Sequence, residues 1–158
     1  MKKLLLLFLI AITISACTSI DCPLNNLVSM NMILKSNNEK MLDTITVSAL
    51  RTTGSDTILY NRGINISNIA IPVSFMQDED QLLITLNDTL GNTYQDTLTI
   101  QKTNQVHFEA VDCQPNYFHT LTGVTTTRHA IDSVIIKNPD IDYDSSKENI
   151  YIYFTPRN

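Results

Sequence analysis

A run of alternating aspartates near the C-terminus has residue types that could bind a metal. Asp140, Asp142 and Asp144 form a D-x-D-x-D run, and carboxylates at this spacing are common ligands of calcium. The similarity to an EF-hand loop stops there, because the sixth position is Ser145 instead of glycine and the twelfth is Tyr151 instead of glutamate. The pattern favours a solvated acidic turn, with weak calcium binding by a surface loop as the alternative.

The three histidines lack the spacing of a known metal or catalytic motif. No two of His107, His119 and His129 have the close spacing of a zinc motif. The sequence has no G-x-S-x-G elbow and no glycine-rich phosphate loop. We therefore expect no enzymatic activity and no cofactor. The alternative is a hydrolase whose histidine and carboxylate converge from distant strands.

The first sixteen residues predict a cleaved signal peptide that decides the compartment of everything after it. Lys2 and Lys3 form a short positive region, and residues 4–14 are apolar except for Thr13. This run is shorter than the roughly 20 residues that a membrane span needs. An uncleaved anchor or a buried core helix is the alternative interpretation.

The end of the leader resembles a bacterial lipobox, in which the cysteine is acylated and becomes the first mature residue. Ile14, Ser15 and Ala16 directly precede Cys17. Each buried methylene contributes about 0.8 kcal/mol, so two or more acyl chains would anchor the protein stably in a membrane. The alternative is plain secretory cleavage that leaves Cys17 as a free thiol.

Removal of residues 1–16 would leave 142 residues, enough for one domain. We expect a lipid-anchored tether over residues 17–26 and a single β domain over residues 27–158. The whole chain carries a net charge of −5, and loss of Lys2 and Lys3 makes it about −7. An acidic domain without a basic stripe is not suited to nucleic acid, so we expect no nucleic-acid partner.

The two remaining cysteines, Cys22 and Cys113, are expected to form a disulfide, because an even pair outside the cytoplasm usually does. Such a bond would connect the tether to a distant strand. Two buried thiols, or metal ligation together with a histidine, are the alternatives. A thiol–imidazole pair of Cys113 with His119 would need the thiol free.

Most of the remaining chain reads as short strands separated by turn residues. Residues 43–50 alternate apolar and polar side chains, and residues 82–86 and 94–100 form two further stripes around a loop at residues 87–92, as in a β-hairpin. Val106, Phe108 and Ala110 continue the alternation toward Cys113. Further strands are expected over residues 27–34, 56–60, 69–75, 117–127, 131–137 and 150–154, with a turn at 61–63 and a kink at 123.

Pro72 lacks an N–H group, which assigns the strand over residues 69–75 to a sheet edge or a bulge. No window beyond the leader has a convincing helical period. The pattern predicts an all-β fold, a single antiparallel β-sandwich of the immunoglobulin-like or transthyretin-like kind. A small open β-barrel is the alternative.

A tripeptide of aspartate, threonine or serine, and an aliphatic residue occurs five times, where about one match is expected from composition. It is a natural strand entry, since aspartate favours turns and threonine and isoleucine favour strands. The tripeptide also resembles the O-glycosylation signal of extracytoplasmic proteins of Bacteroidota. On that resemblance the candidate acceptors are Thr44, Thr57, Thr89, Thr97 and Ser133, with Thr89 in the hairpin loop the most accessible.

Four segments resemble a family of small Bacteroidota lipoproteins of unknown function. These segments are DCPLNN (21–26), DTILYNR (56–62), HFEAVDC (107–113) and FHTLTGVTTTRHAIDSV (118–134). The resemblance supports the compartment and the fold, but the family has no catalytic or ligand residues to transfer. Surface export in those bacteria is associated with acidic residues directly after the lipidated cysteine. Here residues 18–20 are Thr, Ser and Ile, which favours a periplasm-facing position.

Together these patterns predict a lipoprotein of the cell envelope whose β domain is a non-catalytic binding, structural or accessory module. The expected partners are the membrane, through lipid on Cys17, and another envelope protein. A domain that binds a small ligand, or calcium through Asp140, Asp142 and Asp144, is the alternative.

Overall fold

The computed structural model describes residues 22, 28–36 and 42–156. The expected leader, Cys17 and most of the expected tether lie outside these residues. The described part of the chain forms ten strands and no helix. The strands are β1 (Ser29–Lys35), β2 (Thr44–Ala49), β3 (Thr57–Gly63), β4 (Asn68–Pro72), β5 (Glu79–Asn87), β6 (Thr93–His107), β7 (Asn116–Thr126), β8 (Ile131–Ile136), β9 (Asp140–Ile141) and β10 (Ile150–Phe154).

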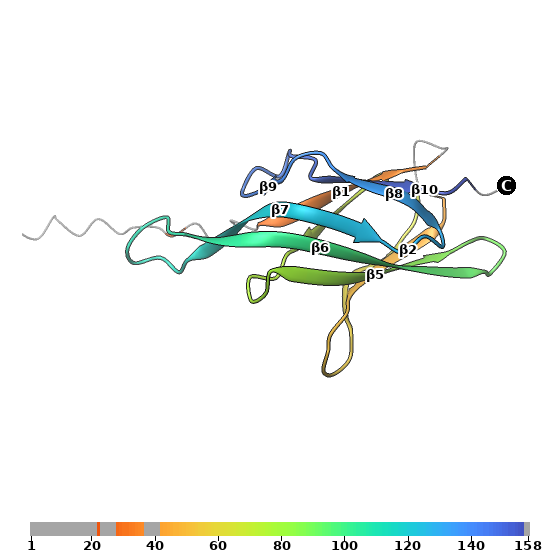
Figure 1. Ribbon diagram of the computed structural model, residues 1–158, viewed down its shortest axis with the longest axis horizontal. Helices are drawn as coiled ribbons and strands as arrows, with labels where there is room; N and C mark the ends of the chain where they lie inside the picture. Colours follow the sequence, from red (N-terminus) through yellow and green to blue (C-terminus); the bar gives the residue numbers. More distant parts are fainter. Residues whose placement is uncertain (1–21, 23–27, 37–41, 157–158) are drawn as a thin grey trace, which may run out of the picture.

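The strands form two sheets that face each other, which confirms the predicted all-β, two-layer architecture (Figure 1). One sheet has four strands in the order β4-β1-β10-β8. The other has six in the order β3-β2-β5-β6-β7-β9 and contains the predicted β5–β6 hairpin. Three of its five strand pairs join sequence neighbours (β2–β3, β5–β6 and β6–β7), and of these the sequence predicted the β5–β6 hairpin.

The first and last strands lie side by side and run parallel, which differs from the expected fully antiparallel pairing. Met32 of β1 pairs with Ile150 of β10. Parallel pairing is possible because no hairpin has to connect strands from opposite ends of the chain. Asn31 and Asn149 fix the register: the Asn31 N–H donates to Asn149 Oδ1 at 2.8 Å, and the Asn149 N–H donates to the Asn31 carbonyl at 3.0 Å.

The apolar stripes of both sheets point into one core between the layers. Each stripe uses every second position, because successive side chains of a strand point to opposite faces. Full burial of such a side chain contributes about 1.5 to 3 kcal/mol, so the core is the main source of stability. The fully buried large side chains are Met30, Met32, Ile45, Ile69, Ile71, Ile84, Leu86, Leu98, Ile100, Ile131, Ile141 and Ile150.

The prediction for Pro72 is confirmed, since β4 is an edge strand and ends at this proline. The expected continuation of the strand to Phe75 is wrong. Phe75 is 50% exposed and stacks on Tyr117 of the other sheet, with 4.5 Å between ring centroids. The chain that follows β4 therefore leaves the four-stranded sheet and reaches β7.

The turn predicted at residues 61–63 is instead a bulged part of β3. Arg62 has a φ of 50°, and the β2–β3 pairing shifts register beside it. A Cβ at Gly63 would lie 2.4 Å from Tyr60 Cε1, so a larger residue in this bulge would require the Tyr60 ring to move. β3 remains paired with β2 on both sides of the bulge and forms one edge of the six-stranded sheet.

β6 and β7 form a long hairpin that extends past the four-stranded sheet at one end of the molecule (Figure 1). Their pairing continues to His107 opposite Asn116, with one register shift between Gln101 and Lys102, near the kink expected at Gly123. The prediction that the alternating strand continues through Phe108 and Ala110 is wrong, since β6 ends at His107. Residues 108–115 form the connecting loop, which we call the tip.

Candidate functional site

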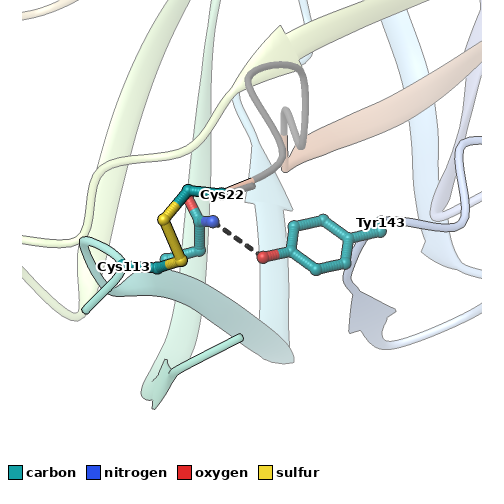
Figure 2. The surroundings of a disulfide bond; sticks show 4 residues. Cys22, Cys113 and Tyr143 are labelled. Carbon is teal, nitrogen blue, oxygen red and sulfur yellow. Dashed lines mark hydrogen bonds between the residues drawn. A yellow bond between two sulfur atoms is a disulfide. The ribbon is translucent and has the colours of Figure 1, made fainter. Parts of the chain in front are cut away.

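A disulfide joins Cys22 to Cys113 at the tip, which confirms the predicted pairing (Figure 2). The two Cα atoms are 5.6 Å apart, within the usual range for this bond. Beside it, Asn116 Nδ2 donates to the hydroxyl of Tyr143 at 2.7 Å. The chain segment that follows the expected anchor is thus covalently attached to the tip, 91 residues away in sequence.

Aromatic rings pack on both faces of the hairpin close to the tip. The His107 ring stacks on Phe118 at 4.3 Å between centroids, and Tyr143 meets Phe118 edge-on at 4.9 Å. On the opposite face Phe75 stacks on Tyr117. We call residues 105–118, together with Phe75 and Tyr143, the hairpin end. Its ring contacts stabilise the hairpin end across strands.

The tip exposes apolar side chains. Val111 is 97% exposed and Phe108 is 61% exposed. The Cys113 N–H donates to the Ala110 carbonyl at 3.1 Å, which places Val111 at the centre of a tight turn. Glu109 lies 3.3 Å from the His107 ring, measured between Oε1 and Nε2. The tip therefore combines two outward apolar groups with nearby carboxylates.

The predicted acidic run is a turn whose carboxylates bind groups of the same chain. Asp142 Oδ2 accepts from the Lys147 ammonium, and Asp144 Oδ1 accepts from the Ser146 N–H at 3.0 Å. Asp140 lies in β9, where Oδ1 is 3.4 Å from the hydroxyl of Thr120. In residues 22, 28–36 and 42–156, no three His, Cys, Asp or Glu side chains are grouped so that they could hold a metal ion.

Interactions within this turn also shift the pKa values of its charged side chains. Burial works to raise the pKa of Asp142, but the Lys147 ammonium and a backbone N–H lower it overall. The hydrogen bonds from Ser146 lower the pKa of Asp144. The Asp142 carboxylate in turn raises the pKa of Lys147. The carboxylates of Asp142 and Asp144 thus accept hydrogen bonds from groups of the same turn.

A buried polar cluster lies at the inner face of the six-stranded sheet, and our sequence reading missed it. Lys102 Nζ is 3.4 Å from Asp80 Oδ2 and donates to the Gln77 carbonyl, with a side chain that is 0% exposed. His119 Nδ1 lies 2.7 Å from Asn104 Oδ1. The sequence does contain a signal, because the inward stripes of the β5–β6 hairpin, extended by two positions, end on Asp80 and Lys102 with opposite charges.

His119 belongs to this cluster and is uncharged at neutral pH. Burial lowers its pKa to about 4, with a further contribution from the positive charge of Lys102, while Asp80 acts in the opposite direction. An imidazole with this pKa would be a weak general base at neutral pH. The side chains of the cluster come from β5, β6 and β7, and their contacts connect these three strands.

A pocket of about 220 Å³ opens beside the cluster, between the edge strand β4 and the strands β3, β2 and β5. Its lining is mainly apolar, with Leu59, Ile71 and Leu82 among the side chains. Arg51 lies at its exposed rim and Asp80 at its buried polar side. A pocket of this size would hold an aliphatic chain or a small ring.

Asp96 makes a second buried network that the sequence reading also missed. Its Oδ1 accepts from the hydroxyl of Thr127 at 2.8 Å and from the N–H of His129 at 2.8 Å, and its Oδ2 accepts from the N–H of Ala130 at 2.8 Å and of Ile131 at 2.9 Å. Burial works to raise the pKa of Asp96, but these donors lower it overall.

This network is not a catalytic triad, although it contains a hydroxyl, an imidazole and a carboxylate. In a triad the hydroxyl contacts the imidazole, whereas here Thr127 and His129 Nδ1 both contact the same Asp96 oxygen. The other donors are backbone groups of the β7–β8 connection. Asp96 therefore holds that connection against β6.

The five candidate glycosylation acceptors occupy different settings. Asp88 shapes the β5–β6 turn, since its Oδ1 accepts from the N–H of Leu90 at 2.9 Å and of Asn92 at 2.8 Å. Thr89, in this turn, is exposed, and the other four acceptors are partly buried. Thr44 begins β2, Thr57 begins β3, Thr97 lies within β6 and Ser133 lies within β8.

The described residues include no helix with the length and hydrophobicity needed to cross a bilayer. Comparison with curated proteins found no match, and comparison with solved structures found none. Residues 44–154, from the first residue of β2 to the last of β10, match a family of unknown function, DUF6452. The expectation of a family of unknown function is thereby confirmed, and the chain belongs to the DUF6452 family.

Proposed function

We propose that this protein is a lipid-anchored lipoprotein of the bacterial cell envelope that acts as a non-catalytic binding or accessory module. The observation that carries the proposal is the Cys22–Cys113 disulfide. Disulfides persist in oxidising compartments outside the cytoplasm. Cys22 follows the lipobox cysteine Cys17 by only five residues, so the oxidised pair and the expected anchor belong to one extracytoplasmic unit.

The interior of the domain supports a non-catalytic role. Every buried side-chain nitrogen or oxygen among the described residues has a hydrogen-bond partner in the protein. Cys22 and Cys113 are bonded to each other and offer no thiol nucleophile. The polar networks around Asp96 and Lys102 connect strands and are closed by groups of the same chain. A binding or supporting role leaves the outer surface as the working part.

The anchor is tested by separating the native envelope from soluble material and measuring intact mass. We expect the protein in the membrane fraction, starting at an acylated Cys17. The C17S variant should move to the soluble fraction, whereas the control S19A should stay with the membrane. Membrane retention of C17S without acyl mass would reject the lipid anchor. Added protease should spare the protein in intact cells and digest it in opened cells if it faces the periplasm.

The accessory role is tested by crosslinking in the native envelope, followed by capture of this protein and mass spectrometry. We expect one partner in a stoichiometric amount. Good recovery of the bait with no enriched partner would reject the accessory role and would direct attention to the pocket.

Binding of a small ligand is a second candidate function, because the pocket is apolar inside with the cationic Arg51 at its rim. A short fatty acid such as octanoate has the matching tail and charge. Binding to the folded state would raise the melting temperature with ligand concentration. The rise should be reduced in R51Q and abolished when L59W fills the pocket. No rise in the native protein would reject this function for short fatty acids.

The Asp-Thr tripeptides carry a further proposal, O-glycosylation at Thr89 before the other candidates, because Thr89 is exposed in a turn. We expect the natively produced protein to carry sugar mass. The T89A variant should lose this mass, and the T97A variant should keep it. A native protein without sugar mass would reject it.

A further inference from the structure

We propose that the tip of the β6–β7 hairpin contacts the lipid bilayer directly, with Val111 and Phe108 entering the interface between headgroups and acyl chains. This inference rests on the proposed lipid anchor and extends it from an attachment to an orientation. It assigns one end of the molecule to the membrane and leaves the opposite end for other partners.

The first step is the reach of the chain between the anchor and the tip. Five residues of extended chain span at most about 18 Å, so Cys22 cannot lie farther than that from an acylated Cys17. The Cα atom of Cys113 lies 5.6 Å from the Cα atom of Cys22, to which it is joined by the disulfide. Without the disulfide, the next described residue is Val28, at the end of an eleven-residue chain that reaches about 40 Å. The disulfide therefore makes the tip the described part held nearest to the membrane.

The second step is what the tip presents at that position. Val111 is 97% exposed and Phe108 is 61% exposed, on a loop whose other neighbours are small or polar. Exposed apolar groups gain most by transfer from water to an apolar phase, and the acyl region is the apolar phase within reach. Aromatic and aliphatic side chains are the groups that membrane-surface segments bury at the boundary between headgroups and acyl chains.

The third step is the charge around the tip, which limits the depth of contact. Glu109 and Asp112 flank the apolar groups, and carboxylates do not enter the hydrocarbon region readily. They would remain among the headgroups, where zwitterionic lipids offer ammonium groups and anionic lipids would repel them. The partner is therefore a bilayer of zwitterionic lipid, contacted shallowly.

The opposite end of the molecule offers a control residue for the contact between the tip and the membrane. The long β6–β7 hairpin places the tip at one end of the long axis, whereas the β5–β6 turn lies at the other end (Figure 1). Leu90 in that turn is 85% exposed, so it matches the tip residues in character but not in position. A tip-down orientation predicts contact for Val111 and none for Leu90.

The chain contains no tryptophan, so one introduced indole reports from a single place. The full-length lipidated protein is purified from the envelope as V111W, F108W or the control L90W. Each is reconstituted into vesicles of phosphatidylcholine and phosphatidylethanolamine, with or without bromine on the acyl chains. Vesicle flotation and intact mass are measured on the same samples, and circular dichroism checks the fold.

We expect V111W and F108W to emit at shorter wavelength than L90W and to lose most of their emission to the brominated lipid. L90W should keep its emission. Equal, unquenched emission from V111W and L90W in protein that is acylated and floats would overturn the tip contact and leave the anchor intact. Protein that lacks acyl mass or fails to float would overturn both the anchor and the contact that rests on it.

Discussion

The sandwich body and the hairpin end are stabilised in different ways, although one pair of strands runs through both. In the body, apolar stripes from two sheets fill a shared core, and the buried charges of Asp96 and Lys102 are satisfied internally. At the hairpin end a disulfide and a few stacked rings replace the core. The hairpin end also exposes Phe108 and Val111.

This difference shows that the two regions depend on different interactions for their stability. A long hairpin that leaves the core is only marginally stable in water unless something else holds it. Here the covalent bond provides that support at the position where the expected tether arrives. The hairpin end can therefore keep Phe108 and Val111 exposed without any loss from the shared core.

The largest expected effect comes from removing the bond that joins the two regions. The double variant C22S/C113S loses a constraint on a loop of about 90 residues, worth roughly 4 to 5 kcal/mol in the chain-entropy model. The midpoint of urea unfolding should fall by this loss of free energy divided by the m-value. A midpoint equal to that of the native protein would mean that the disulfide does not support the fold.

The next effect belongs to the body alone. D96N places an amide where backbone N–H groups of Ala130 and Ile131 now donate to a carboxylate, which should cost roughly 3 to 4 kcal/mol of unfolding free energy. The matched control is D132N at an exposed aspartate of the same tripeptide pattern, with a change within about 0.5 kcal/mol. Equal effects of the two substitutions in denaturant unfolding would refute the role of Asp96.

A pH titration sharpens the comparison further. The pKa of His119 is about 4 in the folded protein against 6.5 for the free side chain, so the unfolded chain takes up its proton first as pH falls. The contribution of His119 to the free energy of unfolding should therefore be fully present above pH 6.5. As the pH falls to about 4, the free energy of unfolding should decrease by roughly 3 kcal/mol. H119Q should flatten this part of the stability curve, and a slope identical to that of the native protein would contradict the assignment.

The smallest expected effect on stability is at the tip. V111S and F108S remove exposed apolar groups that contact no core, so the unfolding free energy should change by no more than about 0.5 kcal/mol. The core variant L98A should cost roughly 2 to 5 kcal/mol in the same assay. A large loss in the serine variants would show that the tip is packed in solution and would remove the contrast between the two regions.

Much of the body could be predicted from the sequence because its signals are local. Alternation identified β2 and the β5–β6 hairpin, and the missing N–H of Pro72 identified an edge strand. The parallel pairing of β1 with β10 could not be found in this way, since it joins opposite ends of the chain and leaves no turn residue as a marker.

The buried charges were missed because the sequence analysis followed only the apolar members of each inward stripe. Asp96 sits two residues before Leu98 on the inward face, and its burial depends on donors from the β7–β8 connection more than 30 residues later. Only the three-dimensional pairing brings these groups together. The disulfide, by contrast, followed from the cysteine count and the expected compartment. The exposure of the tip did not, because it depends on how far β6 and β7 outrun the opposite sheet.

The most direct test of the account is the intact mass of the protein isolated from its native membrane, before and after alkylation of free thiols. The account predicts a chain that starts at Cys17, carries acyl chains and gains no alkyl groups until the Cys22–Cys113 bond is reduced. A chain without acyl mass, or with two thiols that alkylate before reduction, would contradict it.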